Sequence, residues 1–168
     1  EVKNLKVEYT SEGKIVHAVN GVTFHLDRGR TIGLVGETGA GKTSIAKAIL
    51  RILPNPGGKI SDGEVYLEGE DILKRSERGM RKLRGRKISM IFQDPMTSLN
   101  PVKKVVDQIA EVIKTHNKKM SMAEATAEAI KMLGKVGIAE NRAREYPHQF
   151  SGGMKQRVVI AMALACNP

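Results

Sequence analysis

The sequence has little cysteine, few aromatic residues and no long apolar run. Cys166 is the only cysteine among the 168 residues, so no disulfide can form within the chain. A single thiol is compatible with a reducing compartment. No apolar stretch approaches the roughly 18 residues of a membrane-spanning helix, so any membrane role has to come through a partner. The length is that of one ordinary domain with its own core.

Acidic residues are also in deficit, with 18 Asp and Glu against 28 Lys and Arg, a net charge of +10. Much of the surplus lies between Glu70 and Lys87, where eight basic residues accompany three acidic ones. Such an excess attracts nucleic acid. However, no aromatic residue interleaves with these charges to stack on bases. We therefore interpret this segment as a solvated helix and turn, and we expect no direct nucleic-acid partner.

One glycine-rich run carries a specific chemical signal. It reads Gly36-Glu37-Thr38-Gly39-Ala40-Gly41-Lys42-Thr43. This order fits G-x-x-x-x-G-K-[ST], the phosphate-binding loop of nucleotide hydrolases. The glycines let successive N–H groups turn inward toward phosphate oxygens. Lys42 supplies a cation for the β- and γ-phosphates, and the Thr43 hydroxyl is a ligand for Mg²⁺. The run therefore predicts a bound nucleotide.

The residues on either side of the loop support this prediction. The apolar run 31–35 reads as a buried strand, which would lead into the loop. After the loop, apolar residues fall on one face of a helix whose N-terminal dipole would face the phosphates. They are Ile45, Ile49, Ile52 and Leu53. The alternative is an ordinary glycine-rich turn, but a chance match in this length has odds on the order of one in a hundred.

Further strands surround this unit. Residues 2–8 and 19–26 read as strands, and the turn signal at 11–14 predicts that they form an antiparallel hairpin. Residues 63–69 read as another short antiparallel strand. The apolar run 87–92 predicts a strand that ends at Gln93, which would place Gln93 where ligands of open α/β sheets bind.

From Pro101 the apolar period becomes helical, and the first stripe comprises Val102, Val105, Val106, Ile109, Val112 and Ile113. Ser121 and Glu124 are spaced as a capping box. One face of the helix that follows carries Ala125, Ala129, Met132, Leu133 and Val136. Together these patterns predict a helical lobe over about 98–150. A last helix is expected from Lys155 to Cys166, with a second half that is apolar all round and so needs cover on several sides.

The order of three motifs resembles the nucleotide-binding domains of ABC transporters, over essentially the whole chain. They are the loop 36–43, Gln93, and the run Ser151-Gly152-Gly153-Met154. Two longer stretches, 91–101 and 146–157, are similar to the ATPase subunits of bacterial and archaeal dipeptide and oligopeptide importers, a branch that also includes some nickel importers. The resemblance implies an α/β fold of the P-loop NTPase type, with an antiparallel β lobe and a helical lobe.

The resemblance also implies roles for individual residues. Tyr9 would stack on the adenine of ATP, and the loop through Ser44 would hold the phosphates. Gln93 would reach Mg²⁺ and the attacking water, so Lys42 and Gln93 are the catalytic candidates, and Thr43 and Gln93 the metal ligands. Ser151, Gly152 and Gly153 would bind the γ-phosphate held by the opposite subunit. A serine and two glycines at a helix N-terminus form an anion site in their own right, although a plain N-cap and a loop are the alternative interpretation.

The family's next strand carries an aspartate for Mg²⁺ and a glutamate for the attacking water, and a histidine follows later. These would fall beyond Pro168. We therefore expect residues 1–168 to form part of an ATPase domain that lacks the C-terminal part of its core, and to hydrolyse little ATP alone. Its parts would be the β lobe and P-loop core (1–97), the helical lobe (98–150), and the signature motif with its helix (151–168). Met154 replaces the usual Gln of the signature, as is common in the peptide-importer branch.

The prediction that follows is an ATP-binding subunit of an ABC importer for di- or oligopeptides, with ATP and Mg²⁺ as cofactors. Its partners would be a second ATPase subunit in a head-to-tail dimer and transmembrane permease subunits, at the cytoplasmic face of the membrane. Two alternatives remain. One is a soluble ABC-type ATPase acting on nucleic acid or ribosomes, which the net charge permits. The other is an ATP-binding module without turnover of its own.

Overall fold

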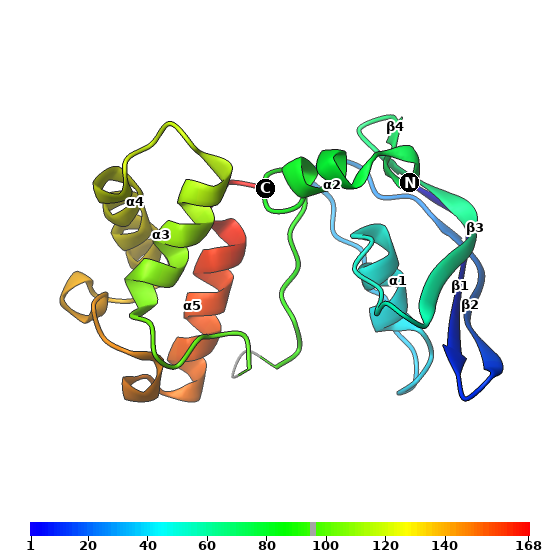
Figure 1. Cartoon of the computed structure of the whole chain (residues 1–168), viewed down its shortest axis with the longest axis horizontal. Coiled ribbons are helices and arrows are strands. Elements are labelled where there is room, and N and C mark those ends of the chain that lie inside the picture. Colours follow the sequence, from blue (N-terminus) through cyan, green and yellow to red (C-terminus); the bar gives the residue numbers. More distant parts are fainter. Residues whose placement is uncertain (95–96) are drawn as a thin grey trace. The chain divides into compact units, whose positions relative to one another are not determined.

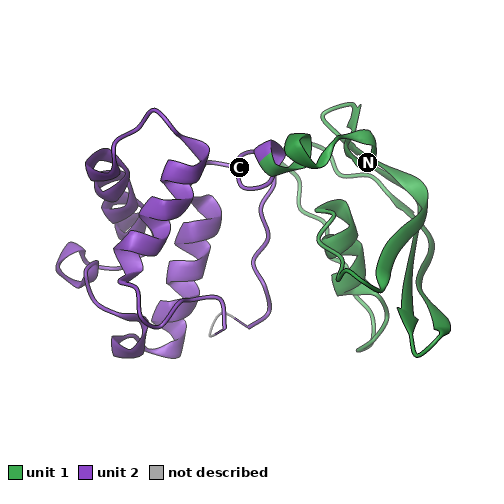
Figure 2. Cartoon of the chain, in the orientation of Figure 1, with its two compact units in different colours: residues 1–81 green, residues 82–168 purple. Residues whose placement is uncertain are grey.

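The chain forms two compact units, residues 1–81 and 82–168, which Figure 2 shows in green and purple. The computed structural model describes residues 1–94 and 97–168. Pro95 and Met96, which belong to the importer-like stretch 91–101, lie outside the described residues. The division falls within the segment 1–97 that we expect to form the β lobe and P-loop core.

A four-stranded antiparallel sheet forms the frame of the first unit (Figure 1). Its strands are β1 (Val2–Ser11), β2 (Lys14–Phe24), β3 (Gly58–Leu67) and β4 (Glu70–Asp71), in the spatial order β2-β1-β3-β4. The predicted hairpin is confirmed, because β1 and β2 pair antiparallel up to Ser11 opposite Lys14. The third predicted strand, over 63–69, is also confirmed, although β3 begins earlier, at Gly58, and ends at Leu67, before a turn at 68–69.

One helix of this unit lies beside the sheet. Helix α1 (Lys42–Ile49) buries Ile45 and Ala48, and it contacts β1, β2 and β3. The helix ends earlier than the apolar spacing predicts, because Arg51 adopts a left-handed backbone with φ of 52°. Ile52 and Leu53 therefore lie after the helix rather than on its face, and this correction shortens the predicted helix by about one turn.

The two strands predicted over 31–35 and 87–92 do not form. Val35 is 94% exposed, and Phe92 is 44% exposed. A strand needs a hydrogen-bonding neighbour, and among the described residues none pairs with 31–35. In the second run only Ile88 takes part in a bridge, an isolated one to Arg84. Both predictions are therefore wrong for the described chain, and Gln93 does not lie at a strand tip.

The second unit is helical. The chain enters it through α2 (Glu77–Leu83), which follows the 3₁₀ turn η1 (Ile72–Lys74) of the first unit after the extended residue Arg75. Its helices are α3 (Val105–His116), α4 (Met122–Lys135) and α5 (Gly152–Leu164), with 3₁₀ turns η2 (Glu140–Arg142) and η3 (Pro147–Gln149). Their apolar faces meet in one core that includes Ile109, Leu133 and Val158, all fully buried.

Most of the predicted helical pattern is confirmed. Ser121 Oγ accepts from the Glu124 N–H at 3.2 Å, and Glu124 Oε2 accepts from the Ser121 N–H at 2.6 Å, which completes the capping box. Val102 is an exception at 79% exposed, because it precedes α3 and its N–H donates to Asn100 Oδ1 in a turn. Among the described residues, no helix combines the length and apolar character of a membrane span.

Candidate functional site

The glycine-rich loop runs into α1 on the first unit, and its geometry depends on Gly41. Gly39 and Gly41 both have left-handed backbones, with φ of 87° and 82°. A Cβ atom on Gly41 would lie 2.3 Å from the carbonyl oxygen of Ala18 in β2. No real side chain tolerates such a distance, so only glycine lets α1 begin against this strand.

Lys42 folds back over the loop that precedes it. Its Nζ donates to the carbonyl oxygens of Gly36 at 2.6 Å and Glu37 at 2.5 Å. The Ala40 N–H donates to Glu37 O at 3.2 Å, which tightens the turn. The ammonium group therefore lies against the backbone of the loop, where the motif expects phosphate oxygens.

Thr43 and Ser44 belong to the first turn of α1, directly after Lys42. The first N–H groups of a helix have no partner within the helix, and the dipole makes this end positive. The first turn of α1 carries no acidic residue. The three side chains at the start of α1 thus offer one cation and two hydroxyls at an electropositive helix end, which is a donor set suited to a phosphate chain with its metal ion.

Tyr9 joins this group from the sheet. It lies on β1, opposite Val16 of β2 and Gly58 of β3. Its hydroxyl is 3.0 Å from Ser44 Oγ, and both side chains are half-buried. The structure therefore brings Tyr9 to the helix that carries Lys42 and Thr43, as a nucleotide contact requires. Sequence reasoning missed both this hydrogen bond and the role of Ala18, since no local pattern signals contacts between distant residues.

Glu8, the neighbour of Tyr9 on β1, contacts ionisable side chains of both adjacent strands. Glu8 accepts from Lys59 Nζ of β3 at 3.0 Å and lies 3.3 Å from Nδ1 of His17 on β2. The hydrogen bond from Lys59 lowers the pKa of Glu8, although partial burial opposes this shift. These contacts span three strands and add to the backbone pairing that holds the strand from which Tyr9 projects.

The remaining predicted residues belong to the second unit. Gln93 is exposed, in a stretch without regular structure. Ser151 is the N-cap of α5 and accepts from the Met154 N–H at 3.4 Å, so α5 begins three residues earlier than predicted. Gly152 and Gly153 are exposed, and a Cβ atom on either would meet no atom within 4 Å. Packing within the described chain therefore does not require glycine at these two positions.

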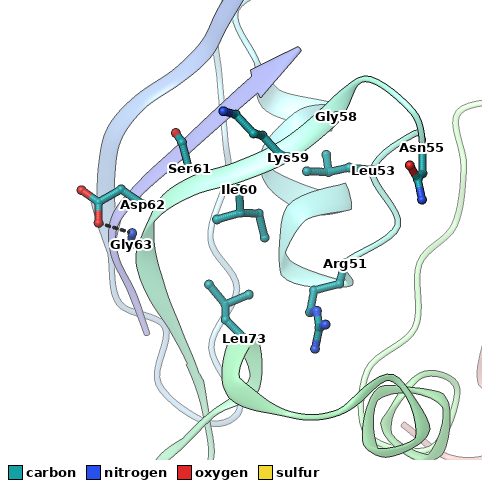
Figure 3. A pocket seen from close by; sticks show the side chains of 10 residues that line it. All are labelled: Arg51, Leu53, Asn55, Gly58, Lys59, Ile60, Ser61, Asp62, Gly63 and Leu73. Carbon is teal, nitrogen blue, oxygen red and sulfur yellow. Dashed lines mark hydrogen bonds between the residues drawn. The ribbon is translucent and has the colours of Figure 1, made fainter. Parts of the chain in front are cut away.

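A separate hollow of about 680 Å³ lies on the first unit (Figure 3). Its walls come from β3, from η1 and from the segment after α1; Figure 3 labels Ile60 and Lys59 on the first and Leu73 on the second. None of the predicted site residues lines it. Among the described residues no group of three or more His, Cys, Asp or Glu side chains could hold a metal ion, so a metal at the loop would depend on hydroxyl, amide and phosphate oxygens.

A sheet lobe whose glycine-rich loop leads into a helix, together with a helical lobe whose last helix begins at Ser151-Gly152-Gly153, defines the class of protein. The ABC transporter family model matches residues 19–168, and the chain belongs to this family. It is 50% identical to the oligopeptide transport ATP-binding protein OppD of Bacillus subtilis, across 100% of this chain and 47% of OppD. It is 48% identical to OppD of Escherichia coli, across 99% of this chain and 49% of that protein.

Solved structures agree with this assignment. The chain resembles the ATP-binding cassette MJ0796, in a dimeric post-hydrolysis state bound to ADP and Pi, with a TM-score of 0.84 and 28% identity. That match covers 99% of this chain and 69% of MJ0796. The fold is therefore that of an ABC nucleotide-binding domain. The chain spans about half the length of the curated relatives it matches.

Proposed function

We propose that the chain binds ATP with Mg²⁺ and is part of the ATP-binding subunit of a peptide importer. The observation that carries this proposal is the geometry around Lys42, whose ammonium lies within 2.6 Å of two loop carbonyls at the start of α1. Thr43 would be a ligand of the metal, and Lys42 would neutralise the β- and γ-phosphates. The identities of 48–50% to oligopeptide transport proteins support a peptide as the transported substrate.

Hydrolysis is proposed to occur where two such subunits face each other head to tail. Ser151, Gly152 and Gly153 would approach the γ-phosphate held by the partner, and Gln93 would position the metal and the attacking water. Two exposed glycines in the first turn of α5 support this arrangement. They cost helix stability relative to alanine, and no neighbour in the described chain explains them. The close approach of another molecule would explain them.

The remaining partners are proposed to be transmembrane permease subunits, with the chain working at the cytoplasmic face of the membrane. The names of the relatives support this proposal, since they are ATP-binding proteins of oligopeptide and dipeptide transport.

The test is a comparison of ATP binding by the chain and by its Lys42→Ala variant, measured by calorimetry with Mg²⁺. Loss of a charge-assisted contact of roughly 1.5–3 kcal/mol predicts at least about tenfold weaker binding. Lys47→Ala is a matched control, because it removes a lysine from the last turn of the same helix. Equal affinities of the wild-type and Lys42→Ala chains would contradict the proposed function.

A further inference from the structure

The hydrogen bond between Tyr9 and Ser44 connects the two ends of the proposed nucleotide site. The donor, Tyr9, lies on β1 and is the residue that the family resemblance implies as the contact of the base. The acceptor lies in the first turn of α1, two residues after Lys42. The family resemblance implies different parts of ATP for these side chains, the adenine for Tyr9 and the phosphates for Ser44, yet in the structure their oxygens are 3.0 Å apart.

The chemistry of the two hydroxyls gives this bond a direction. A phenol is a stronger acid than an aliphatic alcohol, so Tyr9 donates and Ser44 accepts. The one proton of Ser44 then remains for another acceptor. Linked hydrogen bonds polarise one another, so donation by the phenol makes the serine a stronger donor. At a positive helix end beside Lys42, an anion is the acceptor that the local charge favours.

We propose that Tyr9 is a positioning residue for Ser44, and that its phenol directs the Ser44 hydroxyl proton toward a phosphate of the bound nucleotide. This inference rests on the proposed function and goes beyond it, because it gives Tyr9 a role that does not depend on the base. Recognition of base and phosphate is then coupled through one hydrogen bond.

Inorganic triphosphate with Mg²⁺ separates this role from stacking, because it has phosphates and no base. If Tyr9 acted by stacking alone, Tyr9→Phe would bind ATP and triphosphate as the wild type does. We expect Tyr9→Phe to weaken binding of both about two- to tenfold, the range of one neutral hydrogen bond. Tyr9→Ala is expected to weaken ATP further, since the ring is lost as well, and to weaken triphosphate no more than Tyr9→Phe does.

A matched control lies on a neighbouring strand. Tyr66 on β3 donates to Glu64 Oε2 at 3.1 Å, so Tyr66→Phe also removes a hydrogen bond donated by a phenol, but one away from Ser44. We expect this variant to bind both ligands as the wild type does. Ser44→Ala and the double variant complete the cycle: once Ser44 is alanine, Tyr9→Phe should weaken triphosphate binding no further. Calorimetry on the full 168-residue chain measures all affinities.

Three results would overturn the inference: an unchanged triphosphate affinity in Tyr9→Phe, additive effects of the two substitutions, or tighter binding by Tyr9→Phe. The last would mean that the hydrogen bond competes with the nucleotide. Each of these three results counts against the inference only if Lys42→Ala weakens nucleotide binding. In that case the proposed function would stand. Binding that Lys42→Ala leaves unchanged would instead contradict the proposed function and this inference together.

Discussion

The side-chain amide of Gln108 forms hydrogen bonds with both the backbone N–H and the backbone carbonyl oxygen of Asn100. Asn100 N–H donates to Gln108 Oε1 at 2.9 Å, and Gln108 Nε2 donates to Asn100 O at 3.0 Å. The same Nε2 also donates to Lys103 O at 3.0 Å. Gln108 is only 6% exposed, on the first turns of α3. It therefore anchors residues 100–103, which lie just before α3, to the first turn of that helix.

Gln108→Leu is expected to destabilise the chain. Leucine has a similar volume but leaves the backbone groups of Asn100 and Lys103 without their partner, which costs about 1–3 kcal/mol in total. Urea unfolding followed by circular dichroism measures the change. Gln156→Leu on α5 is the control, because Gln156 is exposed and surface substitutions usually stay within about 0.5 kcal/mol. Equal stability of the two variants would show that the hydrogen bonds of the Gln108 side chain contribute nothing to the free energy of unfolding.

Gly41→Ala is expected to disrupt the loop more than Gly39→Ala. Both positions have left-handed backbones, which cost an alanine about 1–2 kcal/mol. Only at Gly41 does the added Cβ meet Ala18 O, at 2.3 Å. Overpacking adds about 1–3 kcal/mol, and the start of α1 has to move. The free energies of unfolding and the ATP affinities of the two variants check this. Indistinguishable values would contradict a tight contact at Gly41.

Gly153→Ala is expected to stabilise the chain and to weaken its association with a second copy. The added methyl group meets no atom within 4 Å, and alanine reduces the entropy of the unfolded chain, for a gain of about 0.4–1 kcal/mol. In the proposed dimer the same methyl group would enter the space of the partner's phosphate. ATP-dependent association, measured by light scattering, should therefore fall while the thermal midpoint rises.

Gly134→Ala provides the matched control for this prediction. Gly134 is an exposed glycine inside α4, and a Cβ there also meets nothing within 4 Å. We expect the same direction of stability change without an effect on association. A Gly153→Ala chain that associates as the wild type does would remove the support that the two glycines give to the head-to-tail arrangement.

The capping box of α4 predicts a contribution to stability that depends on pH. The Ser121 N–H holds the pKa of Glu124 below its ordinary value of 4.5. A depressed pKa in the folded state means that the stabilisation is present above the unfolded pKa and is lost as pH falls through the folded pKa. Glu124→Gln should therefore lower stability at pH 7 and flatten its decline below about pH 4.5.

Thermal unfolding between pH 3 and 7 measures this dependence. Glu128→Gln is the comparison, because it removes another carboxylate of α4 that pairs with Lys131 on the surface and caps nothing. If Glu124→Gln and Glu128→Gln showed the same pH profile, the capping carboxylate would have no special part in acid sensitivity.

Local patterns in the sequence are enough for several features of this protein. The loop 36–43 is a short run whose glycines and lysine each have a local purpose. The hairpin needs only two adjacent strands and a turn, and the capping box of α4 needs only Ser121 and Glu124. The helical stripes follow from a period of 3.6 residues. Each of these depends on residues close together in the chain, and each could be predicted, apart from ends that shifted by a few residues.

Contacts between distant residues decide the rest. The run 31–35 has the composition of a buried strand, but a strand forms only beside a partner, and none of the described segments supplies one. Whether Gly41 could be any other residue depends on Ala18, which lies on β2, more than twenty residues earlier in the chain. Tyr9 meets Ser44 only because the sheet and α1 pack together. Side-chain position at the candidate site is therefore a property of the tertiary structure, since hydrogen bonds and steric limits act through space and not along the chain.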